Sequence, residues 1–550
     1  MRRFTLVVMF LAIFSAPVLS CDFCIKGRQA FRASTPVLIE GLGRHHHPVS
    51  TTNEEAQCYF DQGLTFCFAF NHDEAARSFR RASELDSTLA MAYWGVAYSL
   101  GSNYNQPIDS VREVEAYNNI QKALSLSKHA SQAERDYINA MAVRYTSDAK
   151  PNYAALDSAY MKAMLKLHLQ YPDDEDAATL FVESAMNLRP WKLWNKDGTP
   201  APGTEEIVSV LESVMRRNPD HAGAIHFYIH AVESSPDPFR ALSPADRLGR
   251  QVPAAGHLVH MPGHAYIRTG FYEESIKANY EAVKLDSTYV AAGGGSGFYG
   301  MIYYPHNIHF LAVSYALDGQ FEKAFHYSKM LDDVAGPTYS FDPHIEGVGP
   351  TKWYILAKYH KWDTILSESS PDSNLKVLTA VWHFARGMAF AAKSDITNAK
   401  TELAEFDNLE KDFQKGALMC MINDAHIVAP IPRLLLKAQI AVSENKPEDA
   451  VRYLYEAASI KDALEYDEPE AWYIAPRETL GALLIKLKRY DEAEKVFRDD
   501  LAVYPKEGRL LFGLMTALRL NGKTYEAAMI EQDFKRSWER ADTELSIENL

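Results

Sequence analysis

The feature that most constrains the fold of this chain is a pattern of small and aromatic residues that returns at intervals of about 34 residues. In each copy a small residue is followed by an aromatic residue or leucine, then by alanine and a second large apolar residue. The two clearest copies start at Ala56 and Ile474, with the matching residues Gly63, Phe66, Ala75, Phe79 and Ala82 in the first and Gly481, Leu484, Ala493 and Phe497 in the second. Small residues are needed where two helix backbones approach closely, so each copy predicts one pair of packed helices.

Further copies of the pattern start at Ala222, Gly256, Pro305, Ala380 and Ile431. The spacing and the small-residue positions are those of tetratricopeptide (TPR) repeats, whose helix-turn-helix units bury their apolar faces against one another. We therefore expect an all-α fold, a TPR-type right-handed superhelical solenoid of about nine to eleven helical hairpins. Residues 53–330 should form an N-terminal array with a histidine-lined groove, and residues 331–550 a C-terminal array.

The N-terminus indicates export. Residues 1–20 have the features of a signal peptide, because Arg2 and Arg3 precede an apolar run that is too short to span a bilayer. The run ends in Val18-Leu19-Ser20-Cys21, which resembles a bacterial lipobox and predicts a lipid anchor on Cys21. The mature protein would then face the periplasm or the cell surface, with no other contact to the membrane. Leucine is less usual at position 19, so plain secretory cleavage before Cys21 stays an alternative.

Charge and motifs exclude several classes of function. The net charge of −15 argues against a nucleic-acid partner, which would need a basic face. The sequence has no GxSxG motif, no Walker-type phosphate loop and no dinucleotide-binding fingerprint. No catalytic residue is therefore predicted, and whether the protein is an enzyme stays open.

A group of histidines is the most informative feature for function. In the repeat frame they occupy positions 2, 5 and 9, which line the inner groove of a TPR solenoid. They are His226 and His230 (positions 5 and 9 of the unit at Ala222), His257, His260 and His264 (positions 2, 5 and 9 of the unit at Gly256), and His306 and His309 (positions 2 and 5 of the unit at Pro305). Glu233 occupies groove position 12 of the first unit. Neutral imidazoles with a nearby carboxylate are common ligands of zinc, copper and iron, so the pattern predicts a transition-metal site.

Two alternatives to metal binding stay open for these histidines. TPR grooves bind peptides, so the alternative function is an interaction scaffold that binds a peptide or a protein partner without metal. Some of the histidines could instead satisfy buried polar groups between helices. The sequence has no HExxH motif, so a metalloprotease-type general base is not predicted.

Five further residues are weaker candidates for ligand binding. His45 and His47 belong to a histidine-rich loop within residues 21–52, and this loop either joins the site or only leads into the first helix, capped by Thr52 or Asn53. Glu183 and Asn187 are four residues apart, so they face the same side of a helix. The two alternatives for them are ligand binding and hydrogen bonds to a neighbouring helix. Arg477 lies among aromatic residues, as an anion contact or as a structural joint.

Three motifs give a resemblance to a known group. The segments 226–233 (His-Phe-Tyr-Ile-His-Ala-Val-Glu), 256–272, which contains HxxHxPxH, and 187–191 (Asn-Leu-Arg-Pro-Trp) resemble those of uncharacterised bacterial TPR-repeat proteins. Residues 45–51 and 471–481 are similar as well. Gly263 departs from the group, in which serine is usual. The resemblance implies a TPR fold and the location of a site, and it implies no activity.

Overall fold

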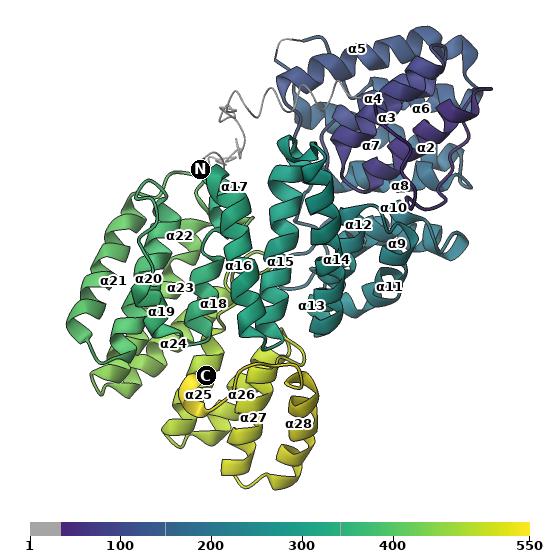
Figure 1. Ribbon diagram of the computed structural model, residues 1–550. Coiled ribbons are helices and arrows are strands. Elements are labelled where there is room, and N and C mark those ends of the chain that lie inside the picture. Colours follow the sequence, from purple (N-terminus) through teal and green to yellow (C-terminus); the bar gives the residue numbers. More distant parts are fainter. Residues whose placement is uncertain (1–34, 149, 341–342) are drawn as a thin grey trace, which may run out of the picture.

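The structure is a computed structural model that describes residues 35–148, 150–340 and 343–550. The predicted signal peptide (residues 1–20) and Cys21 lie outside the described residues. The regular secondary structure of the described chain is helical apart from two short antiparallel strands, β1 (Leu418–Met419) and β2 (Asn423–Asp424). Consecutive helices pair into hairpins that stack along the chain (Figure 1), which confirms the predicted all-α, TPR-type solenoid.

The helices before residue 320 carry all of the predicted histidine site. They are α2 (Glu54–Phe68), α3 (His72–Leu85), α4 (Ala90–Leu100), α5 (Ser110–Leu126), α6 (Gln132–Ala142), α7 (Tyr153–Gln170), α8 (Glu175–Met186), α9 (Thr204–Arg217), α10 (Ala222–Val232), α11 (Leu242–Gln251), α12 (Gly256–His260), α13 (Pro262–Thr269), α14 (Tyr272–Ala291) and α15 (Tyr304–Leu317). A π-helical turn, η4 (Tyr299–Tyr303), precedes α15.

The later helices complete the array. They are α16 (Phe321–Ala335), α17 (Pro343–Val348), α18 (Thr351–Lys358), α19 (Trp362–Ser367), α20 (Lys376–Ala392), α21 (Ile396–Lys411), α22 (Ala425–Val428), α23 (Pro430–Ser443), α24 (Pro447–Asp462), α25 (Pro476–Lys486), α26 (Tyr490–Leu501), α27 (Gly508–Leu520) and α28 (Thr524–Ser537). Within the described residues, the segment Ala425–Ser443 is long and apolar enough to cross a membrane, but most of it is buried in the protein core.

The packing explains why the repeat pattern needs small residues. The ring of Phe79 lies against two glycines, and a Cβ atom would approach it to 2.8 Å from Gly63 and 2.3 Å from Gly95. The same arrangement recurs near the C-terminus, where Phe497 lies between Gly481 and Gly513. Any larger residue at these glycines would have to displace the aromatic ring, so the spacing of small and aromatic residues records direct helix contacts.

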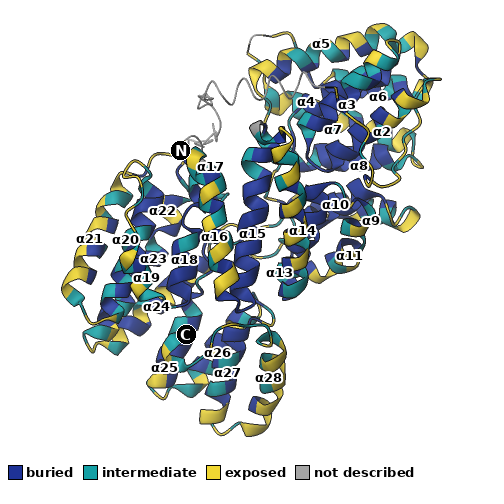
Figure 2. Cartoon of the chain, viewed as in Figure 1, coloured by how far each residue is buried: buried dark blue, intermediate teal, exposed yellow. Residues whose placement is uncertain are grey.

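Buried apolar side chains form two cores that meet around α14 and η4. One core runs from Leu42 to Tyr303 and the other from Tyr272 to Leu550. Figure 2 shows the resulting pattern, in which buried faces line the contacts between hairpins and exposed faces point outwards. The boundary that the sequence places at residue 330 stays a prediction.

The C-terminal helices return to the middle of the chain. In Figure 1 they lie next to the lower ends of α13, α14 and α15. The hydroxyl of Tyr272 donates to the carbonyl of Pro505 at 3.1 Å, and Arg540 pairs with Asp318 at 2.6 Å and with Glu273 at 3.0 Å. The loop between α24 and α25, residues 463–475, also lies against the histidine helices, through Tyr466 and Glu468.

Candidate metal centre

Six of the seven predicted histidines gather into two groups of three. The first triad is His226, His230 and His257, and the second triad is His260, His264 and His306. Within each triad, one ring nitrogen from each histidine lies within 4.8 Å of the other two. Helices α10, α12, α13 and α15 supply them, and we call the two triads together the six-histidine cluster. The structure thus brings six of the predicted residues together, and their role as metal ligands stays a prediction.

Two of the rings are fixed by hydrogen bonds from their outer nitrogens. His226 donates from Nδ1 to the carbonyl of Phe68 at 2.5 Å, and His260 donates from Nδ1 to Oδ1 of Asn279 at 2.6 Å. The orientation of the Asn279 amide follows from its Nδ2, which donates to the carbonyl of Ser275. Each neutral ring therefore keeps its proton on Nδ1 and presents the lone pair of Nε2 to the cluster, as metal-binding histidines usually do.

Glu233 fixes one ring of each triad. Its Oε1 accepts from Nδ1 of His230 at 2.7 Å, and its Oε2 accepts from Nδ1 of His264 at 2.6 Å. Burial alone would raise the pKa of Glu233, but the two histidines hold it well below its usual range, so it is a carboxylate. Nε2 of His230 is buried and has no hydrogen-bond partner. Glu233 was predicted as a metal ligand, and in the structure its two carboxylate oxygens bond the outer nitrogens of two histidines, one from each triad.

A second carboxyl group, Glu468, reaches the cluster from the loop between α24 and α25. Its Oε2 lies 2.9 Å from Nδ1 of His264. Burial and the neighbouring carboxylate of Glu233 raise the pKa of Glu468 well above its usual range, which favours its protonated form. Together with His230 and His264, the two glutamates form a further group of close ligand atoms. Glu468 lies in an acidic stretch without helical periodicity, so the sequence contained no signal for it.

The cluster lies inside the protein and does not line an open groove. His226 and His260 are 0% exposed, and the most exposed member, His306, is 9% exposed. Phe70 closes one side, with its ring centroid 4.5 Å from that of His226 and 5.3 Å from that of His257. Burial and the neighbouring imidazoles lower the pKa values of four members well below the usual range, so these rings are neutral and available as ligands: His226, His257, His260 and His306.

The backbone that holds Phe70 in place is unusual. Phe70 has a φ of 53°, in a region that bulky residues rarely adopt, and it stands between α2 and α3. In this conformation the ring faces the first triad, and its centroid also lies 5.9 Å from that of His230. Such backbone outliers occur often at functional sites, where the surrounding structure maintains them.

Of the seven histidines predicted to line the groove, His309 is the one that the structure leaves outside both triads. It is buried on α15, one turn after His306, and its Nδ1 has no hydrogen-bond partner. Burial lowers its pKa to about 3, so the ring is neutral.

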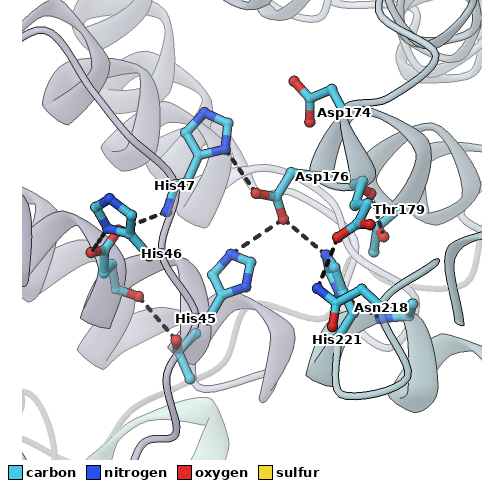
Figure 3. A network of polar contacts seen from close by, with 12 residues as sticks. His45, His46, His47, Asp174, Asp176, Thr179, Asn218 and His221 are labelled. Carbon is cyan, nitrogen blue, oxygen red and sulfur yellow. Dashed lines mark hydrogen bonds and ion pairs between the residues drawn. The ribbon is translucent and has the colours of Figure 1, made fainter.

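His45 and His47 belong to a separate network around Asp176 on α8, shown in Figure 3. His47 Nδ1 lies 2.7 Å from Asp176 Oδ2, and His45 Nε2 and His221 Nε2 lie 3.2 and 3.1 Å from Asp176 Oδ1. Nδ1 of His221 accepts from the backbone N–H of Ala224, so the neutral ring carries its proton on Nε2 and donates it to Asp176. This network attaches the histidine-rich loop to α8 and α10.

The remaining weaker candidates also lie apart from the triads. Asn187 donates to Glu183 at 2.5 Å, and burial raises the pKa of Glu183 to about 7. Arg477 pairs with Asp462 and, at 3.4 Å, with Asp500, both within the C-terminal array. The loop before α2 ends as expected, because the side chain of Asn53 accepts from the backbone N–H of Ala56.

Comparisons with known proteins add little to this description. No family model matches the chain and no curated protein matches it, so the resemblance to uncharacterised bacterial TPR proteins stays a prediction. Similar solved structures include a human IFIT1 dimer with m7Gppp-AAAA (12% identity, TM-score 0.34, covering 88% of this chain and 91% of that chain), the P58(IPK) TPR domain (12%, 0.22, 85% and 99%) and yeast Tom70 (11%, 0.29, 88% and 93%). At these identities and TM-scores, the similar structures give no information on what this TPR-type helical repeat protein binds.

Proposed function

We propose that the six-histidine cluster binds a transition metal, and that holding this metal is the function of the site. The observation that carries the proposal is the 2.6 Å separation of Nε2 of His260 and Nε2 of His264. Both rings donate from Nδ1 to other acceptors, so in the neutral rings both Nε2 atoms are lone pairs. Two lone pairs at this distance repel each other unless a positive ion, a proton or a metal, binds there.

The rest of the geometry favours a metal over a proton. A proton bridges two atoms, whereas three ring nitrogens converge in each triad. A metal would also bind Nε2 of His230, which is buried and has no hydrogen-bond partner. Leaving such a buried polar atom unpaired costs free energy. Imidazole ligands suit zinc, copper and iron, and the groups around the cluster offer imidazoles and carboxylates.

Elemental analysis of the untagged protein tests this proposal. The protein is purified without chelators, incubated with zinc, copper or iron, dialysed and compared with a His257/His260/His264→Ala variant. His383→Ala serves as the matched control, because His383 also bonds a glutamate through Nδ1, at 2.6 Å, but lies outside the cluster. We expect the metal to be stoichiometric in the wild type and the control and lost in the triple variant. Protein that takes up none of the three metals would refute the proposal.

The second candidate function is an interaction scaffold that binds a peptide or protein without metal. The observation in its favour is a cavity of about 800 Å³, lined by Arg44, His46 and Glu134 among others. This cavity is open, whereas the six-histidine cluster is closed. A peptide would bind there and not on the buried histidines. Under this function, a crosslinked partner would attach to the lining of this cavity, and the triple alanine variant would still bind it.

We also propose that the protein is exported and anchored by a lipid on Cys21. The support is the signal-like segment and the lipobox-like residues that end at Cys21. Metabolic labelling with a radioactive fatty acid tests this directly. Label on the wild type that disappears in Cys21→Ser would support the anchor, and an unlabelled protein that is still secreted would indicate plain cleavage.

A further inference from the structure

We propose that the cluster binds two metal ions side by side, one in each triad, and that the repeat itself generates this pair of sites. This inference rests on the proposed metal-binding function and adds the number of ions and the ligands of each. Its basis is that the two triads occupy equivalent places in consecutive units of the array.

The equivalence follows from the repeat frame. His226 and His230 take positions 5 and 9 of the unit at Ala222, and His257 takes position 2 of the following unit. His260 and His264 take positions 5 and 9 of the unit at Gly256, and position 2 of the unit after it is His306, so both triads combine positions 5 and 9 of one unit with position 2 of the next.

The hydrogen bonds of the outer nitrogens repeat in the same way. At position 5, His226 and His260 each donate from Nδ1 to an uncharged oxygen, at 2.5 and 2.6 Å. At position 9, His230 and His264 each donate from Nδ1 to the carboxylate of Glu233, at 2.7 and 2.6 Å. A set of ligands and supporting bonds that is present twice indicates two copies of one site.

The distances between ligand atoms indicate that the two triads are adjacent but form separate sites. Ligands of one ion lie within about 4 Å of one another, because metal–imidazole bonds are about 2.0–2.1 Å long. Each triad forms its own group of nitrogens within 4.8 Å of one another, whereas His230 and His264 meet across the triads in the group that contains Glu233 and Glu468, and no group of close ligand atoms in the described chain contains all six histidines. The nearest rings across the triads, His230 with His264 and His257 with His260, have centroids 5.4 and 5.6 Å apart.

The same frame explains why the series stops at two and why His309 stands alone. A triad before the first would need a histidine at position 2 of the unit at Ala222, where the residue is Gly223. A third triad would start with His309 at position 5, but position 9 of that unit is Val313. His309 is therefore the incomplete remainder of the pattern. With three protein ligands each, both ions keep a coordination position for water or a small ligand, as in sites that perform chemistry.

Metal content after dialysis with zinc tests the inference in single-histidine variants. We expect two ions per chain in the wild type, one in His226→Ala, one in His306→Ala and none in the double variant. His309→Ala is the matched control, on the same helix and at an equivalent position to two ligands, and should keep two ions. Circular dichroism checks folding, and His226→Asn and His306→Asn replace any alanine variant that does not fold.

The outcomes separate this inference from the proposed function. A wild type with one ion, or a single variant that loses both ions, would overturn the two-site inference and leave metal binding intact. Loss of an ion in His309→Ala would overturn the assignment of ligands. A wild type without any metal would refute the proposed function itself.

Discussion

Glu233→Gln is the sharpest test of how the triads are organised. Glu233 accepts two hydrogen bonds, from Nδ1 of His230 at 2.7 Å and from Nδ1 of His264 at 2.6 Å. Glutamine has nearly the same shape but offers one oxygen and one NH₂ group. One histidine can keep its bond to the oxygen, while the other faces the NH₂ group and loses its bond to residue 233. His230 would then have to move its proton to Nε2, and His264 would keep only Oε2 of Glu468, at 2.9 Å, as an acceptor for Nδ1.

The expected magnitude follows from what such supporting bonds contribute. Removal of a carboxylate that orients a metal-bound histidine typically weakens metal affinity by about 10–100-fold, which is about 1.4–2.7 kcal/mol. Because only one histidine is affected at a time, we expect one ion to bind with this loss and the other to bind nearly as in the wild type. The stability of the metal-free protein should change less, since the substitution keeps the volume of the side chain.

Competition with a chromogenic chelator for zinc at pH 7.5 measures this effect. Glu402→Gln is the matched control, because Glu402 accepts from Nδ1 of His383 at 2.6 Å in a different repeat. We expect the control to bind zinc like the wild type. A folded Glu233→Gln variant that binds two ions with unchanged affinity would show that Glu233 does not fix the protonation of the two rings, and the reasoning would fail.

Three further predictions concern the stability of the fold, and thermal unfolding measures each. Burial raises the pKa of Asp286 to about 7, so the free energy of unfolding should fall by roughly 4 kcal/mol as the pH rises from about 4 to 7 and this carboxyl group loses its proton. Asp286→Asn should remove this fall, and an equally steep fall in the variant would exclude Asp286 as the cause. Nζ of the buried Lys358 lies 3.1 Å from a carboxylate oxygen of Glu478 and 3.0 Å from one of Glu507, so Lys358→Met should lower the free energy of unfolding by about 3–5 kcal/mol. An unchanged melting temperature would contradict this. Gly95→Ala should destabilise by about 1–3 kcal/mol because its Cβ would meet the ring of a phenylalanine at 2.3 Å, and stability equal to the wild type would show that the ring can move freely.

The fold and the composition of the cluster followed from local patterns in the sequence. The spacing of Gly63, Phe66 and Phe79 reflects contacts inside one hairpin, and the spacing of the histidines reflects one helix face of adjacent units. Both kinds of information repeat along the chain, so a single sequence is enough to detect them.

What the sequence did not predict depends on contacts between distant segments. Glu468 enters the cluster only because the C-terminal helices return to α14 and α15, and no periodic pattern records this return. Asp176 and His221 belong to different helices and meet His45 only in three dimensions. The burial of the cluster has the same origin, since covering segments such as the one at Phe70 come from other repeats.

The return of the C-terminal helices has a consequence for exchange rates. An ion in the second triad would be covered on one side by the loop that carries Glu468, and it could leave by that side only after this loop and the helices attached to it move away. The bond between Tyr272 and Pro505 and the pairs of Arg540 oppose that movement. Residence time is therefore set by how often the molecule opens, and affinity alone does not determine it.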